Sequence, residues 1–350
     1  MSRFFSNKYK ELIPYTPGEQ PLDKRYIKLN TNESPFPPSP LAQKLAREAA
    51  ADLNLYSDPR CLALVKAGCD FFGVSPDEIL FTNSSDEALN FAFMAFCDKE
   101  CPAAFADVSY GFYPVFARLN GITFRQIPLR EDFTIDPADY KNLEHTIFIA
   151  NPNAPTGIAL ELDAIEEIVR NNPKNVVVVD EAYVDFGAQS AFPLIRRYDN
   201  LLITQTFSKS RSLAGGRLGF AIGNSALIND LNTIKYSTNP YSVNRMSMAA
   251  GIGALTDRDY FRQCCEKIME TREYTRKALQ KLGFECMPSK TNFLFARHPL
   301  MEGAALYQAL RERGVLVRHF DQPRIRDYNR ITVGTREQMQ ILLGILEEML

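Results

Sequence analysis

The sequence predicts an α/β fold, with a large domain built on a mostly parallel central sheet wrapped by helices and a small α+β domain after it. Between residues 78 and 223, short apolar segments alternate with segments of helical periodicity. One of them, residues 176–180, consists of four valines and an aspartate, which is typical of a strand buried on both faces. After residue 258 a long helical segment leads into short strands and helices, which favours a separate small unit.

The elements follow from these patterns in order. Residues 1–40 are rich in proline, so we expect an extended segment that packs with the small domain and the site. Residues 41–257 are expected to form the large domain and residues 258–350 the small one. Helices are expected at 40–53, 61–72, 85–96, 113–120, 162–170, 228–235, 242–255, 260–282, 304–313 and 337–350. Strands are expected at 78–82, 103–107, 123–127, 146–150, 176–180, 201–204, 218–223, 293–297, 315–318 and 330–333.

Composition excludes several classes of protein. The chain of 350 residues has a net charge of −2 and no basic block, so we expect no nucleic-acid partner. No apolar run approaches the roughly 20 residues that span a bilayer, so we expect no membrane partner. The seven cysteines include no Cys-x-x-Cys pair and are expected to be reduced thiols in a cytoplasmic protein. The three histidines lie far apart in the sequence, so we expect no metal site.

Lys209 is the main candidate for chemistry. It lies among small and hydroxyl residues between two predicted strands, with Arg217 eight positions later. A lysine held in an apolar pocket has a lowered pKa and can form a Schiff base with an aldehyde cofactor. The hydroxyls of Thr206 and Ser208, together with Arg217, would suit a phosphate nearby. Taken alone, such a lysine is more often a solvated loop residue, and the rest of the chain is what argues against that interpretation here.

Four further motifs stand at the ends of predicted strands. Residues 82–87 open a helix with small residues, which suits an anion but also a plain helix cap. Tyr110 could stack on a planar cofactor or pack in the core. The turn at residues 151–157 directs asparagine amides at the strand ends or has no chemistry. Asp180 follows the four valines and is either a partner for a pyridinium nitrogen or a helix cap.

Together these motifs indicate a phosphorylated pyridine aldehyde as cofactor. They supply a Schiff-base lysine, an acid for the ring nitrogen, a stacking ring and a phosphate cup, all at successive strand ends. The chain resembles the fold type I pyridoxal-phosphate-dependent aminotransferases, and within them the histidinol-phosphate branch. The resemblance spans nearly the whole length and rests on motifs at residues 29–35, 56–59, 85–87, 151–157, 180–183, 208–217 and 330–335.

The resemblance implies roles for the cofactor and catalytic residues. Lys209 would form the Schiff base with pyridoxal 5′-phosphate and move the proton of transamination. Asp180 would keep the ring nitrogen protonated, and Tyr183 with an asparagine of the turn would contact the ring oxygen. The implied cofactor-binding set is Ser85, Asp86, Tyr110, Asn153, Asp180, Tyr183, Thr206, Ser208, Lys209, Arg217 and Tyr56.

The resemblance also implies how substrates bind. Arg330 would pair with the carboxylate of glutamate or 2-oxoglutarate. Tyr15 and Arg318 would grip the substrate phosphate, and Asn32 would lie in the flap that closes over the site. Tyr56 would reach the cofactor phosphate of the neighbouring subunit, which implies a homodimer with shared active sites.

Three positions depart from the family pattern. Ala154 stands where the asparagine that contacts the ring is usual, so Asn153 is expected to take over that contact or the contact is lost. Ser84 replaces a usual glycine in the phosphate cup. Arg211 stands where a small or apolar residue is common, and of the two possibilities, a charge near the phosphates or a solvated side chain, we expect the solvated one.

The leading hypothesis is therefore an aminotransferase that converts L-histidinol phosphate and 2-oxoglutarate to imidazole-acetol phosphate and L-glutamate, in histidine biosynthesis, by a ping-pong mechanism. One alternative is a decarboxylase of threonine phosphate, which shares the cofactor motifs. Another is an aminotransferase of aromatic amino acids, although Arg318 argues against it. A non-catalytic relative is a third alternative, supported only by Ala154.

Overall fold

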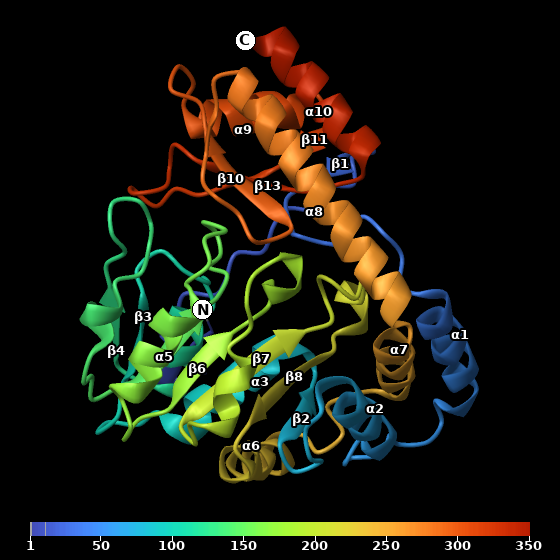
Figure 1. The fold of residues 1–350 in the computed structure, drawn as a ribbon, viewed down its shortest axis with the longest axis vertical. Coiled ribbons are helices and arrows are strands. Elements are labelled where there is room, and N and C mark those ends of the chain that lie inside the picture. Colours follow the sequence, from blue (N-terminus) through green and yellow to red (C-terminus); the bar gives the residue numbers. More distant parts are fainter. Residues whose placement is uncertain (1, 11) are drawn as a thin grey trace.

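A seven-stranded sheet forms the centre of the computed structural model, which describes residues 2–10 and 12–350. Its strand order is β2-β8-β7-β6-β5-β3-β4 (Figure 1). The pairs among β7, β6, β5, β3 and β4 are parallel, whereas β8 is antiparallel to both of its neighbours. The strands are β2 (Ile79–Thr82), β3 (Ala103–Ala106), β4 (Phe124–Ile127), β5 (Thr146–Ala150), β6 (Val177–Asp180), β7 (Leu201–Thr206) and β8 (Gly219–Gly223).

Helices cover both faces of this sheet, because side chains alternate in direction along each strand. Val178 of β6 packs into a core formed with α3 (Ser84–Phe96), α4 (Tyr113–Asn120) and α6 (Ser225–Thr238). Val177 and Val179 pack on the other side, with α1 (Pro40–Ala49), α2 (Leu62–Phe72), α5 (Leu162–Arg170) and α7 (Arg245–Thr256). The expected mostly parallel sheet wrapped by helices is confirmed.

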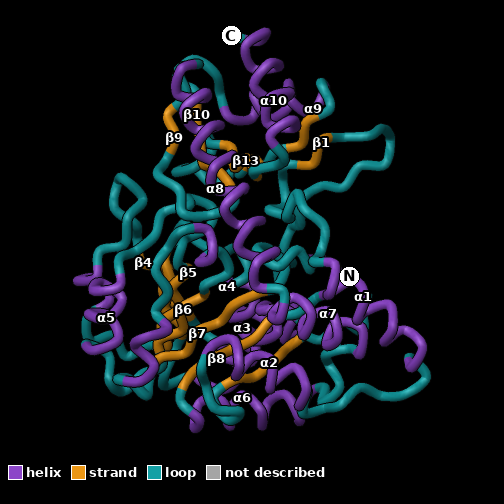
Figure 2. The backbone as a smooth tube through the Cα atoms, turned by 45° about the vertical axis from the view of Figure 1, so that its right-hand side comes forward, coloured by secondary structure: helices purple, strands orange, loops and turns teal. Residues whose placement is uncertain are grey.

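The C-terminal unit stands above the large sheet in Figure 1 and Figure 2 and has its own core. Its antiparallel sheet has the order β12-β13-β10-β9. Its elements are α8 (Arg258–Lys281), β9 (Glu285–Cys286), β10 (Phe293–Arg297), α9 (Gly303–Glu312), β11 (Val315–Leu316), β12 (Arg318–His319), β13 (Asn329–Thr332) and α10 (Arg336–Met349). The long helix α8 rises from the large unit into this one (Figure 1).

The N-terminal segment joins the two units. It contains a short helical turn (Asn7–Tyr9) and the strand β1 (Ile27–Lys28), which the sequence patterns did not predict. β1 pairs in parallel with β11, and Leu29 is buried in the C-terminal core. The segment between β1 and α1 then contacts the turns after β6 and β7, through the hydrogen bonds of Asn32 to Tyr183 and of Lys209 to Thr31. The N-terminal segment is therefore packed against the C-terminal unit.

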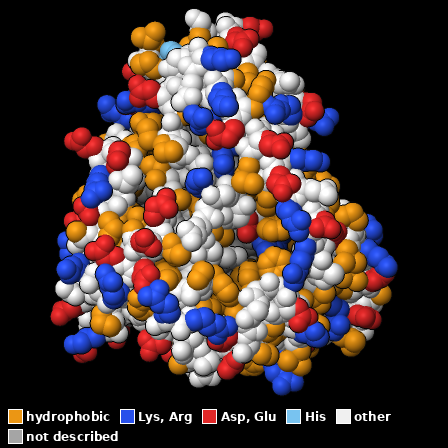
Figure 3. Space-filling view, viewed as in Figure 1, with side chains coloured by type: hydrophobic (Ala, Val, Ile, Leu, Met, Phe, Trp, Pro, Cys, Tyr) orange, Lys and Arg blue, Asp and Glu red, His pale blue; other side chains and the backbone are white. Residues whose placement is uncertain are grey.

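On the face shown in Figure 3, positive and negative side chains are mixed, and there is no large patch of a single charge. None of the described helices is both long enough and apolar enough to cross a membrane.

Candidate active site

Two adjoining cavities lie at the carboxyl ends of the parallel strands. In such sheets the turns after successive strands meet at one edge. The first cavity has a volume of about 340 Å³ and the second of about 480 Å³. Both volumes lie in the range of small-molecule sites. The two cavities share the residues Thr31, Tyr110, Ala154, Tyr183 and Lys209.

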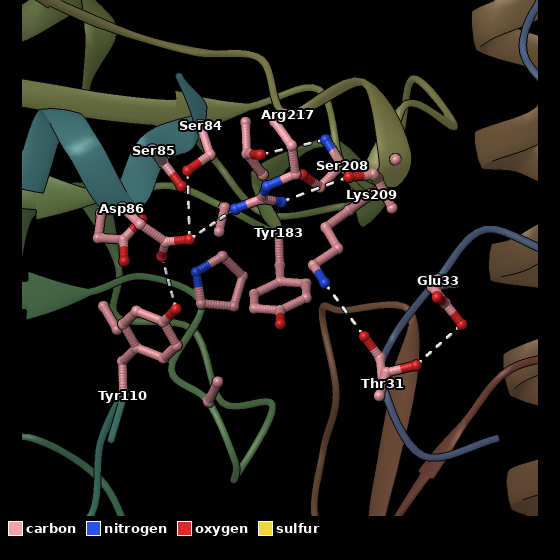
Figure 4. Close-up of a pocket in the computed structure, with 18 of the residues that line it drawn as sticks. Thr31, Glu33, Ser84, Ser85, Asp86, Tyr110, Tyr183, Ser208, Lys209 and Arg217 are labelled. Carbon is pink, nitrogen blue, oxygen red and sulfur yellow. Dashed lines mark hydrogen bonds and ion pairs between the residues drawn. The ribbon is translucent and has the colours of Figure 1, made fainter. Parts of the chain in front are cut away.

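Lys209 lies at the boundary of the two cavities, on the turn after β7. Its Nζ donates a hydrogen bond to the carbonyl oxygen of Thr31 at 3.2 Å, and it lies 5.9 Å from the centre of the Tyr183 ring (Figure 4). Burial, followed by the charge of Arg330, lowers the pKa of Lys209 to about 8. At this pKa roughly a tenth of the amine is neutral, and nucleophilic, at pH 7, far more than for an ordinary lysine.

Asp180 ends β6 and lines the first cavity. Its Oδ2 accepts a hydrogen bond from the hydroxyl of Tyr113 at 3.1 Å, and its Oδ1 accepts one from Thr204 at 3.3 Å. Burial raises the pKa of Asp180 to about 7. Among residues 2–10 and 12–350, no lysine, arginine or histidine forms an ion pair with this carboxylate.

The N-terminus of α3 points at the same cavity and resembles an anion-binding cup. Ser84 and Ser85 line the cavity, and Ser84 has a left-handed backbone with φ of 70°. The Ser84 N–H donates to the carbonyl oxygen of Arg217. Gly219 of β8 lies so close that an added Cβ would be 2.2 Å from the Ser85 nitrogen. Only a glycine there lets β8 and the start of α3 approach one another.

Asp86 lies within this cup and links two predicted cofactor residues. Its Oδ1 accepts a hydrogen bond from the hydroxyl of Tyr110 at 2.7 Å. Its Oδ2 forms an ion pair with Arg217 at 2.9 Å (Figure 4). Thr206 and Ser208 line the same cavity, and the Ser208 N–H donates to the Thr206 hydroxyl.

Tyr183 connects the cavity to the N-terminal segment. Its hydroxyl accepts a hydrogen bond from the Nδ2 of Asn32 at 2.9 Å. Asn32 is buried, and its Oδ1 and backbone N–H bond to the Thr332 hydroxyl of the C-terminal unit. A single asparagine thus joins the N-terminal segment, the turn after β6 and strand β13.

The turn at residues 151–157 brings Ala154, and not Asn153, to the first cavity. The Nδ2 of Asn153 donates to the Val108 carbonyl and to the Thr156 hydroxyl. Its Oδ1 accepts from the Ser109 hydroxyl. The amide is therefore fully engaged within the loops, and the structure does not bring Asn153 to the other predicted cofactor residues.

The second cavity is lined by cations and by no acidic residue among those described around it. Its charged residues are Lys209, Arg118, Arg318 and Arg330. Arg330 donates to the carbonyl oxygen of Asn30 at 3.0 Å, and its Nε has no partner among the described residues. Burial lowers the pKa of Arg330. Such a lining suits an anionic substrate.

Tyr15 and Arg318 also line the second cavity, as expected of neighbouring substrate residues. The ring of Tyr15 stacks on Phe112 at 4.3 Å. The guanidinium of Arg318 donates to the carbonyl oxygens of Thr16 and Pro17, at 2.9 and 3.1 Å. These bonds hold the N-terminal segment over the cavity.

The expectation that the side chain of Arg211 is solvated is wrong. Its side chain is 1% exposed and pairs with Asp185 at 3.0 Å. The guanidinium lies against the rings of Phe71, Phe207 and Phe261, at 4.4 to 5.3 Å from their centres. An arginine can be buried here because the aromatic faces and one carboxylate receive its charge.

Tyr56 lies apart from the other predicted residues. It is 81% exposed, lines neither cavity and stacks on the ring of Tyr241 at 4.7 Å. Within one chain, the structure therefore does not bring Tyr56 to the site.

Tyr113 and Glu33 are among the residues around the first cavity to which the sequence patterns gave no role. Tyr113 bonds to Asp180, and the only sequence signal was its place at the start of a helix after Tyr110. Glu33 lines the cavity and pairs with Lys28 at 2.8 Å. Glu33 lies in a segment without regular structure, so neither helix nor strand periodicity could place it.

Comparison with known proteins identifies the class of this fold. Among solved structures, histidinol-phosphate aminotransferase from Sinorhizobium meliloti, in complex with pyridoxal 5′-phosphate, aligns with a TM-score of 0.87. It is 22% identical, and the match covers 100% of this chain and 99% of that one. An aspartate aminotransferase from Thermus thermophilus aligns with a TM-score of 0.85 at 20% identity, over 100% of both chains. The fold is that of the pyridoxal-phosphate-dependent aminotransferases, fold type I.

The sequence comparisons place the chain within this class. Residues 24–346 match the family described as aminotransferase class I and II. The histidinol-phosphate aminotransferase of Brachyspira hyodysenteriae is 50% identical over 98% of both chains. That of Marinomonas sp. is 49% identical over 99% of both. The chain belongs to the class I and II aminotransferases, whose cofactor is pyridoxal phosphate.

Proposed function

We propose that this chain transfers the amino group of L-histidinol phosphate to 2-oxoglutarate, giving imidazole-acetol phosphate and L-glutamate. The observation that carries the proposal is the pair of cavities that share Lys209. The first cavity joins this lysine to Asp180 and to the anion cup, and the second offers Arg318 and Arg330 to an anionic substrate. The name shared by the relatives at 45 to 50% identity supports the same substrate.

The residues around the first cavity fit pyridoxal phosphate. Asp180 is a buried carboxylate without a cationic partner among the described residues, which suits a pyridinium nitrogen. The start of α3, Ser208, Thr206 and Arg217 would hold the phosphate. Tyr183 would contact the ring oxygen without help from Asn153, whose amide is engaged elsewhere. Tyr110 would stack on the ring.

When bound, pyridoxal phosphate supplies the aldehyde that takes up the amino group and a ring that accepts electron density. Lys209 would hold the cofactor and then act through its Nζ as the base that removes the proton from the amino-bearing carbon of the donor. Its lowered pKa keeps this nitrogen able to accept a proton near neutral pH. Asp180 would hold a proton on the ring nitrogen.

The second cavity would bind both substrates in turn. Arg330 would bind the carboxylate of 2-oxoglutarate, because its Nε is free among the described residues and guanidinium binds carboxylates through two parallel bonds. Arg318 and Tyr15 would bind the phosphate of histidinol phosphate. Asn32 would close over the substrate while its amide keeps the hydroxyl of Tyr183 in place.

The active unit would be a homodimer. Tyr56 is exposed and distant from its own cavities, which supports a role at the cofactor phosphate of the partner subunit. We further propose that residues 41–257 and 258–350 act as large and small domains joined at α8, with residues 1–40 spanning both. The unpaired state of the seven cysteines supports a cytoplasmic enzyme.

A substrate assay with an arginine variant tests this proposal. We expect glutamate to form from histidinol phosphate and 2-oxoglutarate, and no carbon dioxide to form from threonine phosphate. Arg318→Gln should raise the KM for histidinol phosphate by about tenfold or more without loss of cofactor affinity. Arg313→Gln removes an exposed arginine whose side chain bonds, among the described residues, only to its own helix, and should leave KM unchanged. The proposal would be overturned if the wild type released carbon dioxide from threonine phosphate and Arg318→Gln left the KM for histidinol phosphate unaltered.

A further inference from the structure

We infer that Tyr113 is a positioning residue for Asp180: its hydroxyl fixes the direction of the carboxylate and favours its ionised form. The inference rests on the proposed role of Asp180 at the cofactor nitrogen. Tyr113 is the first residue of α4 and is fully buried. Its hydroxyl donates to the Oδ2 of Asp180 at 3.1 Å. It does not border either cavity, so it acts only through Asp180.

The surroundings hold the Tyr113 ring in one orientation. Phe105 and Phe148, from the neighbouring strands β3 and β5, lie 5.5 and 5.8 Å from it. Tyr110 meets it edge to face at 5.6 Å and 87°. A ring enclosed on these sides cannot swing its hydroxyl away without moving the core. The donor is therefore preorganised at one oxygen of the carboxylate.

The carboxylate is otherwise held by weaker or neutral groups. Thr204 of β7 donates to the other oxygen, but at the longer distance of 3.3 Å, and the backbone N–H of Ala182 also favours the ionised carboxylate. The ionisable groups that act on Asp180 from the surrounding elements are Asp86 of α3, Tyr113, Tyr110 and Tyr183. In the described part of the chain, no lysine, arginine or histidine forms an ion pair with it. The hydrogen bond from Tyr113 is thus a main means by which the protein favours the charged form over the neutral one.

This bond matters because the buried carboxylate must stay ionised to attract a protonated ring nitrogen. Burial opposes ionisation, and hydrogen bonds to the charged form favour it. Tyr113→Phe keeps the volume of the ring and removes one donor. The pKa of Asp180 should then rise, so the ionised carboxylate should be lost at a higher pH than in the wild type. Binding of the cofactor should weaken first on the acid side.

Binding of pyridoxal phosphate to the apoenzyme, measured by equilibrium titration across a range of pH, tests this inference. Tyr113→Phe should bind the cofactor about tenfold more weakly near neutral pH. The pH at which affinity is half lost on the acid side should shift upward. Tyr140→Phe is the matched control, because Tyr140 is equally buried and its hydroxyl has no partner among the described residues. That variant should match the wild type in both affinity and pH dependence.

A second variant keeps the test decisive if Tyr113→Phe folds poorly. A 3-fluorotyrosine at position 113 keeps the shape and makes the hydroxyl a stronger donor. It should move the acid-side transition downward, opposite to Tyr113→Phe. Wild-type pH dependence in the variants that fold, even if only one of them does, would overturn the role of Tyr113.

Asp180→Asn separates this result from a failure of the proposed function. If Asp180→Asn binds the cofactor like the wild type, the assigned role of Asp180 is wrong and the inference about Tyr113 is overturned with it. If Asp180→Asn loses affinity while both Tyr113 variants behave as wild type, the proposed function stands and only the role of Tyr113 is overturned.

Discussion

At the residue scale, the site depends on ionisable groups whose pKa burial has moved toward neutrality. The pKa of Lys209 falls to about 8, and those of Asp180 and Glu181 rise to about 7. Glu181 faces away from the cavity, where Ser190, Gln205 and the Ala191 N–H bind its carboxylate. Of two adjacent buried acids, one therefore anchors the turn after β6 and the other borders the cavity.

The lowered pKa of Lys209 predicts how the reactivity of its amine depends on pH. Only the neutral amine reacts with an amine-directed reagent, so labelling of Lys209 in the apoenzyme should rise with pH and be half-maximal near pH 8. Ordinary exposed lysines have a pKa of about 10.4 and should serve as internal controls in the same peptide map. Labelling of Lys209 that followed the exposed lysines would contradict the desolvated setting described for it.

The sequence could place a residue in the site when that residue stood at the end of a predicted strand. Lys209 and Tyr110 follow strands and Asp180 ends one, and topology brings the ends of parallel strands together. The surroundings of Arg211 could not be predicted, because its aromatic partners come from α2, the turn after β7 and α8. The hydrogen bonds of Asn153 could not be predicted either, since its partner Ser109 lies 44 residues away in the sequence.

At the scale of elements, the contact between β8 and α3 should control the anion cup. In Gly219→Ala the new Cβ would lie 2.2 Å from the Ser85 nitrogen and 2.4 Å from the Ser84 carbonyl carbon. We expect displacement of the start of α3, a loss of about 1–3 kcal/mol of stability and weaker cofactor binding. Gly344→Ala, in α10 with open space around it, should leave binding unchanged and stabilise the protein slightly. Equal cofactor affinity in the two variants would rule out the tight contact.

The buried Arg211 should stabilise the junction of α2, α8 and the turn after Lys209. Arg211→Ala leaves Asp185 without its cation and the three rings without their partner, so we expect a loss of about 2–4 kcal/mol in the free energy of unfolding. Asp185 is partly exposed, which limits the cost of leaving it alone. Arg258 lies over the same Phe71 ring at 4.9 Å but is exposed. Chemical denaturation of Arg258→Ala should show a loss of less than about 1 kcal/mol. A similar loss in both variants would contradict the account.

Most helices and strands could be predicted because apolar residues recur along them at the regular spacing of a helix or a strand. The boundaries of α4, β5, α5 and β10 agree with the expected ranges. β1 and β9 were missed because each has two residues, too few for a period. Their pairing depends on partners far along the chain, which a local pattern does not contain.

At the scale of the whole molecule, the proposed homodimer with shared active sites predicts complementation between two defective chains. Lys209→Ala should remove the catalytic base, and Tyr56→Ala should weaken cofactor binding in the partner's site. A heterodimer of the two variants contains one site with both wild-type residues, so mixing them should restore part of the activity. Turnover of refolded mixtures against the separate variants measures this. Absence of any recovery, with heterodimers present, would contradict the placement of Tyr56 in the partner's site.

The separate C-terminal sheet and core follow the change of pattern after residue 258, whereas the path of the first residues could not be predicted. The N-terminal segment reaches across both units through β1, Asn32 and the bonds of Arg318 to Thr16 and Pro17. Proline-rich sequence predicts an extended chain without saying where that chain lies. Closure of the second cavity by this segment is therefore a property that only the folded molecule reveals.

The most direct test of the central claim is an absorbance titration of the holoenzyme with one substrate at a time. Histidinol phosphate alone should bleach the yellow absorbance of the bound cofactor, and 2-oxoglutarate added afterwards should restore it and release glutamate. Threonine phosphate should produce neither change. If histidinol phosphate leaves the spectrum unchanged, and threonine phosphate reacts with release of carbon dioxide, the chain is a decarboxylase and the proposed amino transfer is wrong.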